Sequence, residues 1–347
     1  MPASSTEGLV VRARRLLLVL CATAFVALIA DGDRTGTASP ITSRTLVPSA
    51  RDAFGLPARS SLARRNGRIV YADSSLGRGW WMFTVNAEGR DKKLLTRDGG
   101  IWPQWSPDGT KLVFTRGDNL LTMRARPGAV PRFLIKGPIN GAAGVAAGIP
   151  ALAAHWSPDG RRITFATVRG IEVANADGSG RRLLLRNRPQ QLYFGDPDWS
   201  PDGGQIVLAG SSWAPLTWPS VPEQIYVMRS NGTGLRQLTG GFIRFHRDPS
   251  WSRDGRWILF AQCPAPWAAS RVSELVLLKP NGSDQRTIER LPGTDCASMI
   301  TWSPDGHKIL YLNERTGVEV MNVNGSGRRH LLPWALGVDG LSWQPLP

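Results

Sequence analysis

The pentapeptide WSPDG stands at Trp105–Gly109, Trp156–Gly160, Trp199–Gly203 and Trp302–Gly306, and a variant, WSRDG, stands at Trp251–Gly255. A catalytic motif usually occurs once in a chain, whereas a recurring motif is more often a building part of a repeat fold. Ser-Pro-Asp-Gly has the residue preferences of a type I turn, with proline at its second position and glycine at its end. The motif therefore predicts a repeated structural corner, with the tryptophan packed between neighbouring repeats.

The tryptophans also set the length of the repeat. They lie 41 to 52 residues apart, and the last, Trp343, stands in a degenerate copy at the end of the chain. Each of the first five copies is followed by two alternating apolar segments, a tight turn such as ADGS or SNGT, and a last short apolar segment. Asn-Gly and Asp-Gly between extended segments are strong hairpin signals. Four short strands per repeat of this length are typical of the blades of a β-propeller.

The two ends of the repeat region complement each other. Three predicted strands, the first starting at Arg68, precede the first tryptophan, and a single tryptophan strand ends the chain. These strands form a complete blade only if the segment around Trp343 lies beside the one at Arg68. The sequence thus predicts an all-β fold, a six-bladed β-propeller over residues 66–347 that is closed by the C-terminal strand.

The repeated WSPDG, followed by a strand, an Asp-Gly or Asn-Gly turn and a closing Leu-Thr, resembles the repeat of the TolB-like β-propeller family. The stretch QIYVMRSNGTGLRQLT at 224–239 is close to that pattern. The resemblance covers about residues 66–347 and implies the fold rather than one function, because the same repeats occur in translocation-complex proteins and in peptidase propellers. The α/β domain that precedes the propeller in TolB itself and the Gly-x-Ser-x-Gly elbow of propeller-bearing serine peptidases are not found in the sequence.

The N-terminal region has the pattern of an export signal. Arg12, Arg14 and Arg15 precede the uncharged, mostly apolar run Leu16–Ala30, which is short for crossing a bilayer. Residues 1–30 are therefore predicted to be a helical signal peptide or membrane anchor. Residues 31–65, rich in Gly, Ser, Thr, Pro and Arg, are predicted to be a disordered linker. This organisation predicts an extracytoplasmic location, secreted, periplasmic or membrane-anchored.

The charge of the chain does not indicate a nucleic-acid partner. The formal net charge is +15, but the arginines are spread along the chain and gather only in pairs such as Arg161–Arg162. No recognition helix, zinc-finger spacing or RNA-binding signature accompanies them.

The loops of a four-stranded blade alternate between the two faces of a propeller. The WSPDG and Asn-Gly corners are short and are expected on one face, while long irregular loops are expected on the other. Trp213, Trp218 and Trp267 stand in those irregular loops, and aromatic residues on a rigid frame suit a protein or glycan partner. The alternative is that they only cover the top of the core.

Strand starts expected to face the central channel carry Asp196, Asp248 and Asp339, with His246 near them. Carboxylates on adjacent blades suit a cation or a basic peptide, and the alternative is that Asp-Pro starts a strand and caps its backbone. A calcium site needs about six oxygen ligands, and the sequence contains no metal, phosphate or dinucleotide motif. No metal ion and no cofactor is therefore predicted.

Cys263 and Cys296 are expected in loops of neighbouring blades on the irregular face. An exported chain meets an oxidising environment, so a disulfide between them is allowed by the topology.

These observations predict an exported, non-enzymatic, monomeric propeller that binds an envelope protein or polysaccharide. The sequence is also compatible with two alternative functions. One is a propeller lyase or hydrolase that uses the acidic residues at the channel mouth, and the other is a membrane-anchored sensor domain.

Overall fold

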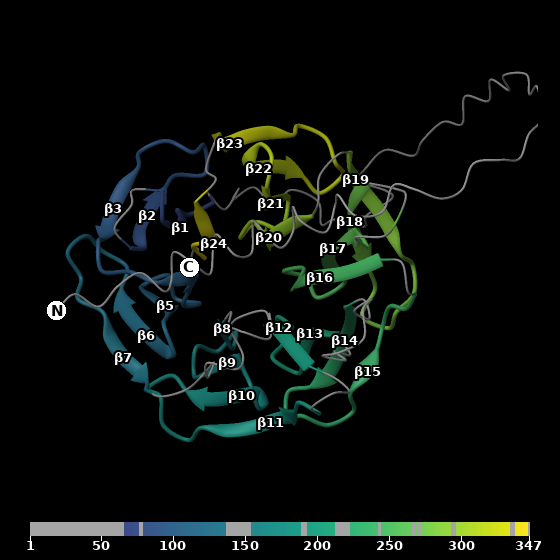
Figure 1. The fold of residues 1–347 in the computed structure, drawn as a ribbon, viewed down its shortest axis with the longest axis horizontal. Coiled ribbons are helices and arrows are strands. Elements are labelled where there is room, and N and C mark those ends of the chain that lie inside the picture. The colour runs from purple at the N-terminus through teal and green to yellow at the C-terminus, as the bar shows by residue number, and fades with distance from the viewer. Residues whose placement is uncertain are drawn as a thin grey trace, which may run out of the picture. The chain divides into compact units, whose positions relative to one another are not determined.

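Each of the five WSPDG-type corners joins the first strand of a four-stranded antiparallel sheet to the second, and a sixth sheet contains the C-terminal strand; the six sheets stand around a common axis in the computed structural model (Figure 1). The structure describes residues 66–75, 79–136, 154–188, 193–211, 223–241, 244–265, 268, 272–292, 296–333 and 337–345. The predicted N-terminal helix and linker, at 1–30 and 31–65, lie outside these ranges.

We number the sheets as blades 1 to 6. Blade 1 contains β24 (Val338–Trp343), β1 (Ile69–Asp73), β2 (Trp81–Val85) and β3 (Lys93–Thr96). Blade 2 contains β4 (Ile101–Trp105), β5 (Lys111–Arg116), β6 (Asn119–Arg124) and β7 (Arg132–Ile135). Blade 3 contains β8 (Ala154–Trp156), β9 (Arg162–Thr167), β10 (Gly170–Asn175) and β11 (Arg182–Arg186).

The other three blades repeat this order. Blade 4 contains β12 (Tyr193–Trp199), β13 (Gln205–Ser211), β14 (Gln224–Arg229) and β15 (Arg236–Gln237). Blade 5 contains β16 (Arg244–Trp251), β17 (Ile258–Pro264), β18 (Val272–Leu278) and β19 (Arg286–Pro292). Blade 6 contains β20 (Ala297–Trp302), β21 (Lys308–Asn313), β22 (Gly317–Asn322) and β23 (Arg329–Pro333).

The second strand of a blade is apolar on both faces because each face is covered by a neighbouring blade. In β5, Leu112, Val113 and Phe114 are all fully buried. Leu112 and Phe114 pack in a cluster with Met82 of blade 1, whereas Val113 packs with Ile163 of blade 3. Burying an aliphatic or aromatic side chain of this size contributes about 1.5–3 kcal/mol. The hydrophobic core is therefore divided among the contacts between blades.

The WSPDG corner has the hydrogen bonds of the expected turn. The Gly109 N–H donates to the Ser106 carbonyl at 2.8 Å. The Ser106 hydroxyl donates to Asp108 at 2.5 Å and accepts from the Lys111 N–H at 2.9 Å. The hydrogen bond from Ser106 holds the pKa of Asp108 below its ordinary value. The same serine contacts recur in the other four copies, so the motif closes each corner locally.

The C-terminal strand closes the ring. Strand β24 pairs with β1 in antiparallel register, with Ile69 opposite Trp343 and Val70 opposite Ser342. The Gln344 N–H then donates to the Arg68 carbonyl at 2.7 Å. The inner strands of neighbouring blades contact one another all the way round, including β20 with β24 and β24 with β4. The all-β, six-bladed propeller with C-terminal closure is confirmed.

The described residues include no helix long and apolar enough to cross a bilayer.

Candidate functional site

A cavity of about 430 Å³ lies on the axis of the propeller, within the range usual for ligand pockets. Every blade contributes its inner strand to the lining. The six corner tryptophans all take part: Trp105, Trp156, Trp199, Trp251, Trp302 and Trp343. We refer to this cavity as the channel.

One end of the channel is shaped by a bulge that recurs in the inner strands. Three residues before the corner tryptophan, the backbone enters the left-handed region, with φ of 49° at Asp196, 50° at Asp248, 51° at Trp102, 57° at Met299 and 76° at Gly340. The pairing with the second strand shifts register at these positions. All five residues line the channel. Bulges commonly re-aim side chains beside functional sites.

Asp196 and Asp248 therefore occupy equivalent places on adjacent blades. They lie within β12 and β16 at the bulge, rather than at the strand starts where the sequence placed them. The Asp248 carboxylate accepts a hydrogen bond from the Met299 N–H of the next blade at 3.0 Å. Asp196 makes no hydrogen bond or ion pair with the residues that the structure describes.

Both carboxyl groups are hard to ionise. Burial raises the pKa of Asp196 well above its ordinary value, and the charges of Asp248 and Glu223 raise it further, against the opposing effect of Arg247. Burial also raises the pKa of Asp248, to about 6. An ionised carboxylate in such surroundings lacks solvation and gains from a cation placed beside it. The binding of a positively charged group is therefore favoured at this end of the channel.

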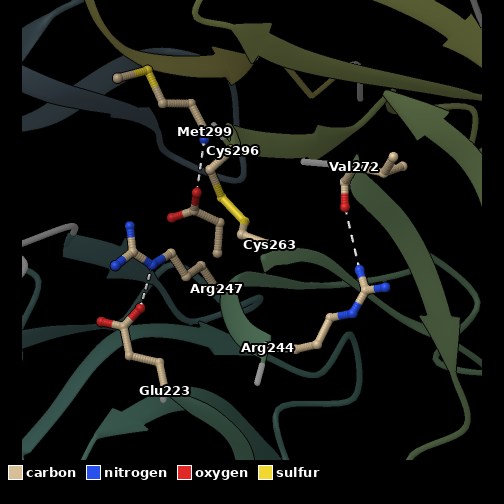
Figure 2. The surroundings of a disulfide bond; sticks show 8 residues. Glu223, Arg244, Arg247, Cys263, Val272, Cys296 and Met299 are labelled. Atoms are coloured by element: carbon tan, nitrogen blue, oxygen red, sulfur yellow. Dashed lines mark hydrogen bonds and ion pairs between the residues drawn. A yellow bond between two sulfur atoms is a disulfide. The ribbon is translucent and has the colours of Figure 1, made fainter. Parts of the chain in front are cut away.

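Two charged residues that the sequence did not single out interact electrostatically with these carboxyls, although they do not line the channel. The Arg247 guanidinium of β16 forms an ion pair with Glu223 at 2.5 Å, and the two side chains point toward each other in Figure 2. Glu223 raises the pKa of Arg247. The group as a whole thus contains three carboxyls and one guanidinium. We call Asp196, Asp248, Glu223 and Arg247 the acidic end of the channel.

The disulfide lies beside this group. Cys263 of β17 is bonded to Cys296, the residue before β20, with their Cα atoms 5.3 Å apart (Figure 2). It joins blade 5 to blade 6 three residues before Met299, whose N–H binds Asp248. The cross-link therefore restrains the strand that supports one of the channel carboxylates.

His246 and Asp339 do not join Asp196 and Asp248 in the channel lining. The His246 ring is buried, lies 3.0 Å from the Gln224 amide oxygen and 3.2 Å from that of Gln262, and packs edge-on against Phe260. Burial lowers its pKa to about 4, so the ring is neutral at pH 7. Asp339 lies in β24 opposite Ala72, next to the bulge at Gly340.

The tryptophans expected on the irregular loops, Trp213, Trp218 and Trp267, lie outside the described residues.

A second polar ring lies deeper in the channel, at the residue before each corner tryptophan. Its members line the cavity: Gln104, His155, Asp198, Ser250, Thr301 and Ser342. Asp198 contacts the His155 ring at 3.2 Å and accepts from the N–H groups of Trp199 and Trp251. Asp198 is thereby engaged in joining three blades. Across the described parts of the chain, no group of three or more His, Cys, Asp or Glu side chains is arranged to hold a metal ion.

Comparisons with known proteins agree with this architecture. No family model matches the sequence. Over 117 residues, 32% of this chain and 15% of the relative, it is 29% identical to Dipeptidyl-peptidase 5 of Porphyromonas endodontalis. Over 161 residues, 45% of this chain and 33% of the relative, it is 29% identical to the Tol-Pal system protein TolB of Bordetella pertussis. The chain spans a third or less of the length of these curated relatives.

A solved structure extends the likeness over most of the chain. The crystal structure of TolB from Acinetobacter baumannii matches with a TM-score of 0.61 at 18% identity, covering 85% of this chain and 70% of that one. Identity at this level carries information on the fold alone. Six blades, C-terminal closure and this structural match lead to one conclusion: the chain is a six-bladed β-propeller with the TolB-like fold.

Proposed function

We propose that this chain is a non-enzymatic binding propeller that works in the cell envelope, outside the cytoplasm, and that it holds a basic side chain of a protein partner at the acidic end of the channel. The observation that carries the proposal is Asp196, a channel-lining carboxyl group without a hydrogen-bond or ion-pair partner among the described residues.

Energetics support a cationic ligand. Asp196 is partly buried, and a carboxylate with reduced solvation and no partner is costly, which is why its pKa is raised. An ammonium or guanidinium group placed beside Asp196 would offset the lost solvation with a charge-assisted hydrogen bond. Asp248 on the next blade adds a second acceptor, while Arg247 is already paired with Glu223. The carboxylates of Asp196 and Asp248 can therefore accept hydrogen bonds from one more cation.

Two observations support a protein partner in the envelope. The Bordetella pertussis relative is named as a component of the Tol-Pal system, and the N-terminal residues have the pattern of an export signal. A rigid closed ring also suits binding, because its inner strands present side chains on a frame that needs little reorganisation.

A peptide titration tests the proposal. Acetyl-Ala-Lys-Ala-amide and its glutamine counterpart are titrated against the protein by calorimetry, with the fluorescence of the channel tryptophans as a second readout. We expect the lysine peptide to bind and the glutamine peptide to bind at least about 10-fold more weakly. Asp196→Asn should reduce affinity for the lysine peptide by a similar factor.

Asp118→Asn is the matched control, because Asp118 is exposed and does not line the channel. It should leave the affinity unchanged. Equal binding of the two peptides, or full affinity in Asp196→Asn, would contradict the proposal.

A further inference from the structure

The WSRDG corner of blade 5 places an arginine in a ring of prolines. The second residue after each corner tryptophan lines the end of the channel opposite to Asp196, and in five of the six blades it is proline: Pro107, Pro158, Pro201, Pro304 and Pro345. In blade 5 it is Arg253, which lines the same space.

Arg253 keeps the backbone geometry of the ring. Most members pack against the corner glycine of the next blade, as Pro201 does at Gly255, where an added Cβ would lie 3.3 Å from the ring carbon of the proline. Arg253 meets Gly306 in the same way, with the two Cβ positions 3.8 Å apart. The corner also keeps its turn, since the Gly255 N–H donates to the Ser252 carbonyl at 3.0 Å. The exchange of proline for arginine therefore changes the lining and leaves the corner intact.

The guanidinium of Arg253 has no hydrogen-bond or ion-pair partner among the described residues. Asp198 is the carboxylate whose charge favours it, but Asp198 already contacts His155 and accepts from two backbone N–H groups. Arg253 is exposed to solvent and lines the channel, so its guanidinium can reach a ligand there. The channel thus has an unpaired carboxyl group at one end and an unpaired guanidinium at the other.

We infer that Arg253 forms an anion subsite for a free carboxylate, so that the channel holds the C-terminal residues of the partner, with a cationic group against Asp196 and the terminal carboxylate against Arg253. This inference rests on the proposed function and adds the chemical class of the ligand. A guanidinium matches a carboxylate with two parallel N–H donors. Asp248 and Arg253 are five residues apart along the chain, which limits the span between them to roughly 16 Å. A peptide of two to four residues, at about 3.4 Å per residue, fits that span.

The test compares the tripeptide Lys-Ala-Ala with its C-terminal amide by calorimetry on the intact protein. We expect the free acid to bind wild type about 10-fold more tightly than the amide. In Arg253→Pro, which carries the proline of the other blades and should fold normally, this difference should vanish. Arg253→Lys should retain part of it. Arg126→Gln, which removes an exposed arginine outside the channel, should retain all of it.

Each outcome separates this inference from the proposed function. If Asp196→Asn weakens both peptides while Arg253→Pro changes neither, the anion subsite is wrong and the proposed function stands. If neither peptide binds wild type below about 1 mM, both are wrong. If inorganic phosphate displaces the free acid far better than acetate does, the subsite takes phosphate and the assignment to a carboxylate is wrong.

Discussion

At four of the rim turns the glycine is required for two separate reasons. Gly178 has a φ of +87°, and a Cβ added there would lie 2.2 Å from the Leu134 carbonyl oxygen of the preceding blade. The equivalent glycines Gly89, Gly232 and Gly325 also abut a carbonyl oxygen of the neighbouring outer strand, at 2.4 Å. The turn residue that allows positive φ is thus also the point where adjacent blades meet at the rim.

Gly178→Ala should therefore destabilise the protein more than a glycine substitution at a turn with open space. Gly117 is the matched control, because its φ is +55° and nothing lies within 4 Å of its Cβ position. Left-handed backbone alone costs alanine about 1–2 kcal/mol, and the carbonyl clash should add at least about 1 kcal/mol to the loss at Gly178. Urea unfolding measures both variants; equal losses would contradict the rim contact.

Asp196 illustrates a conflict between binding and stability. Its folded pKa is raised, so the native state holds the proton more tightly than the unfolded chain does. The resulting stabilisation is complete below the unfolded pKa, near pH 4, and is lost as the pH rises through the folded pKa. As the pH rises, ionisation of this carboxyl group increasingly opposes folding unless a cationic ligand lies beside it.

Asp196→Asn should consequently gain stability relative to the unliganded wild type as the pH rises from 4 to 8, because the amide has no charge to desolvate. Near pH 4 the variant and wild type should be equally stable, because wild-type Asp196 is then protonated. Thermal denaturation from pH 4 to pH 8 checks this. A variant that loses stability at pH 7 would show that the carboxylate is held by a partner in the free protein.

The inner strands carry the candidate binding residues, and their local geometry was the hardest feature to predict from the sequence. Alternation and turn signals predicted that the strands exist, because those signals are local. The bulge was not visible in the sequence, because the positive φ falls on residue types as different as Trp102, Asp196 and Met299. The ion pair between Glu223 and Arg247 joins residues on different blades, and only the folded register brings them together.

The disulfide between β17 and the start of β20 should stabilise the contact between blades 5 and 6. A cross-link that spans 33 residues of sequence is worth about 2–4 kcal/mol. Dithiothreitol should therefore lower the melting temperature of wild type to near that of a Cys263→Ala/Cys296→Ala variant, and it should leave the variant unchanged. A wild type insensitive to the reductant, with free thiols detected after treatment, would contradict the stabilising role.

Closure gives the whole molecule its stability, because it leaves no blade with an unpaired inner position. Trp343 and Leu341 of β24 are buried in one cluster with Ile69 and Tyr71 of β1 and with residues of blade 6. Counting strands in the sequence was enough to predict this pairing, since one tryptophan strand and one three-stranded set remained at opposite ends. The identity of the channel residues could be read from the sequence only in part, because His246 lies near Asp248 in sequence but packs away from the channel.

A circular permutant tests closure at this level. Joining Pro347 to Asn66 with a short Gly/Ser linker, and opening the chain between residues 144 and 145, should give a folded protein, because Gln344 already hydrogen-bonds Arg68. We expect its melting temperature to lie within about 10 °C of that of residues 66–347 alone. A second permutant, opened between residues 216 and 217, controls for the choice of opening. Failure of both to fold cooperatively would contradict the closed ring.

A crystal structure of the protein bound to Lys-Ala-Ala would show directly whether the channel binds a cationic peptide. We expect the peptide in the channel, with an ammonium group within about 3.2 Å of the Asp196 carboxylate. A peptide bound on the rim or on the loops, with the channel unchanged and Asp196 without a cationic neighbour, would contradict this expectation.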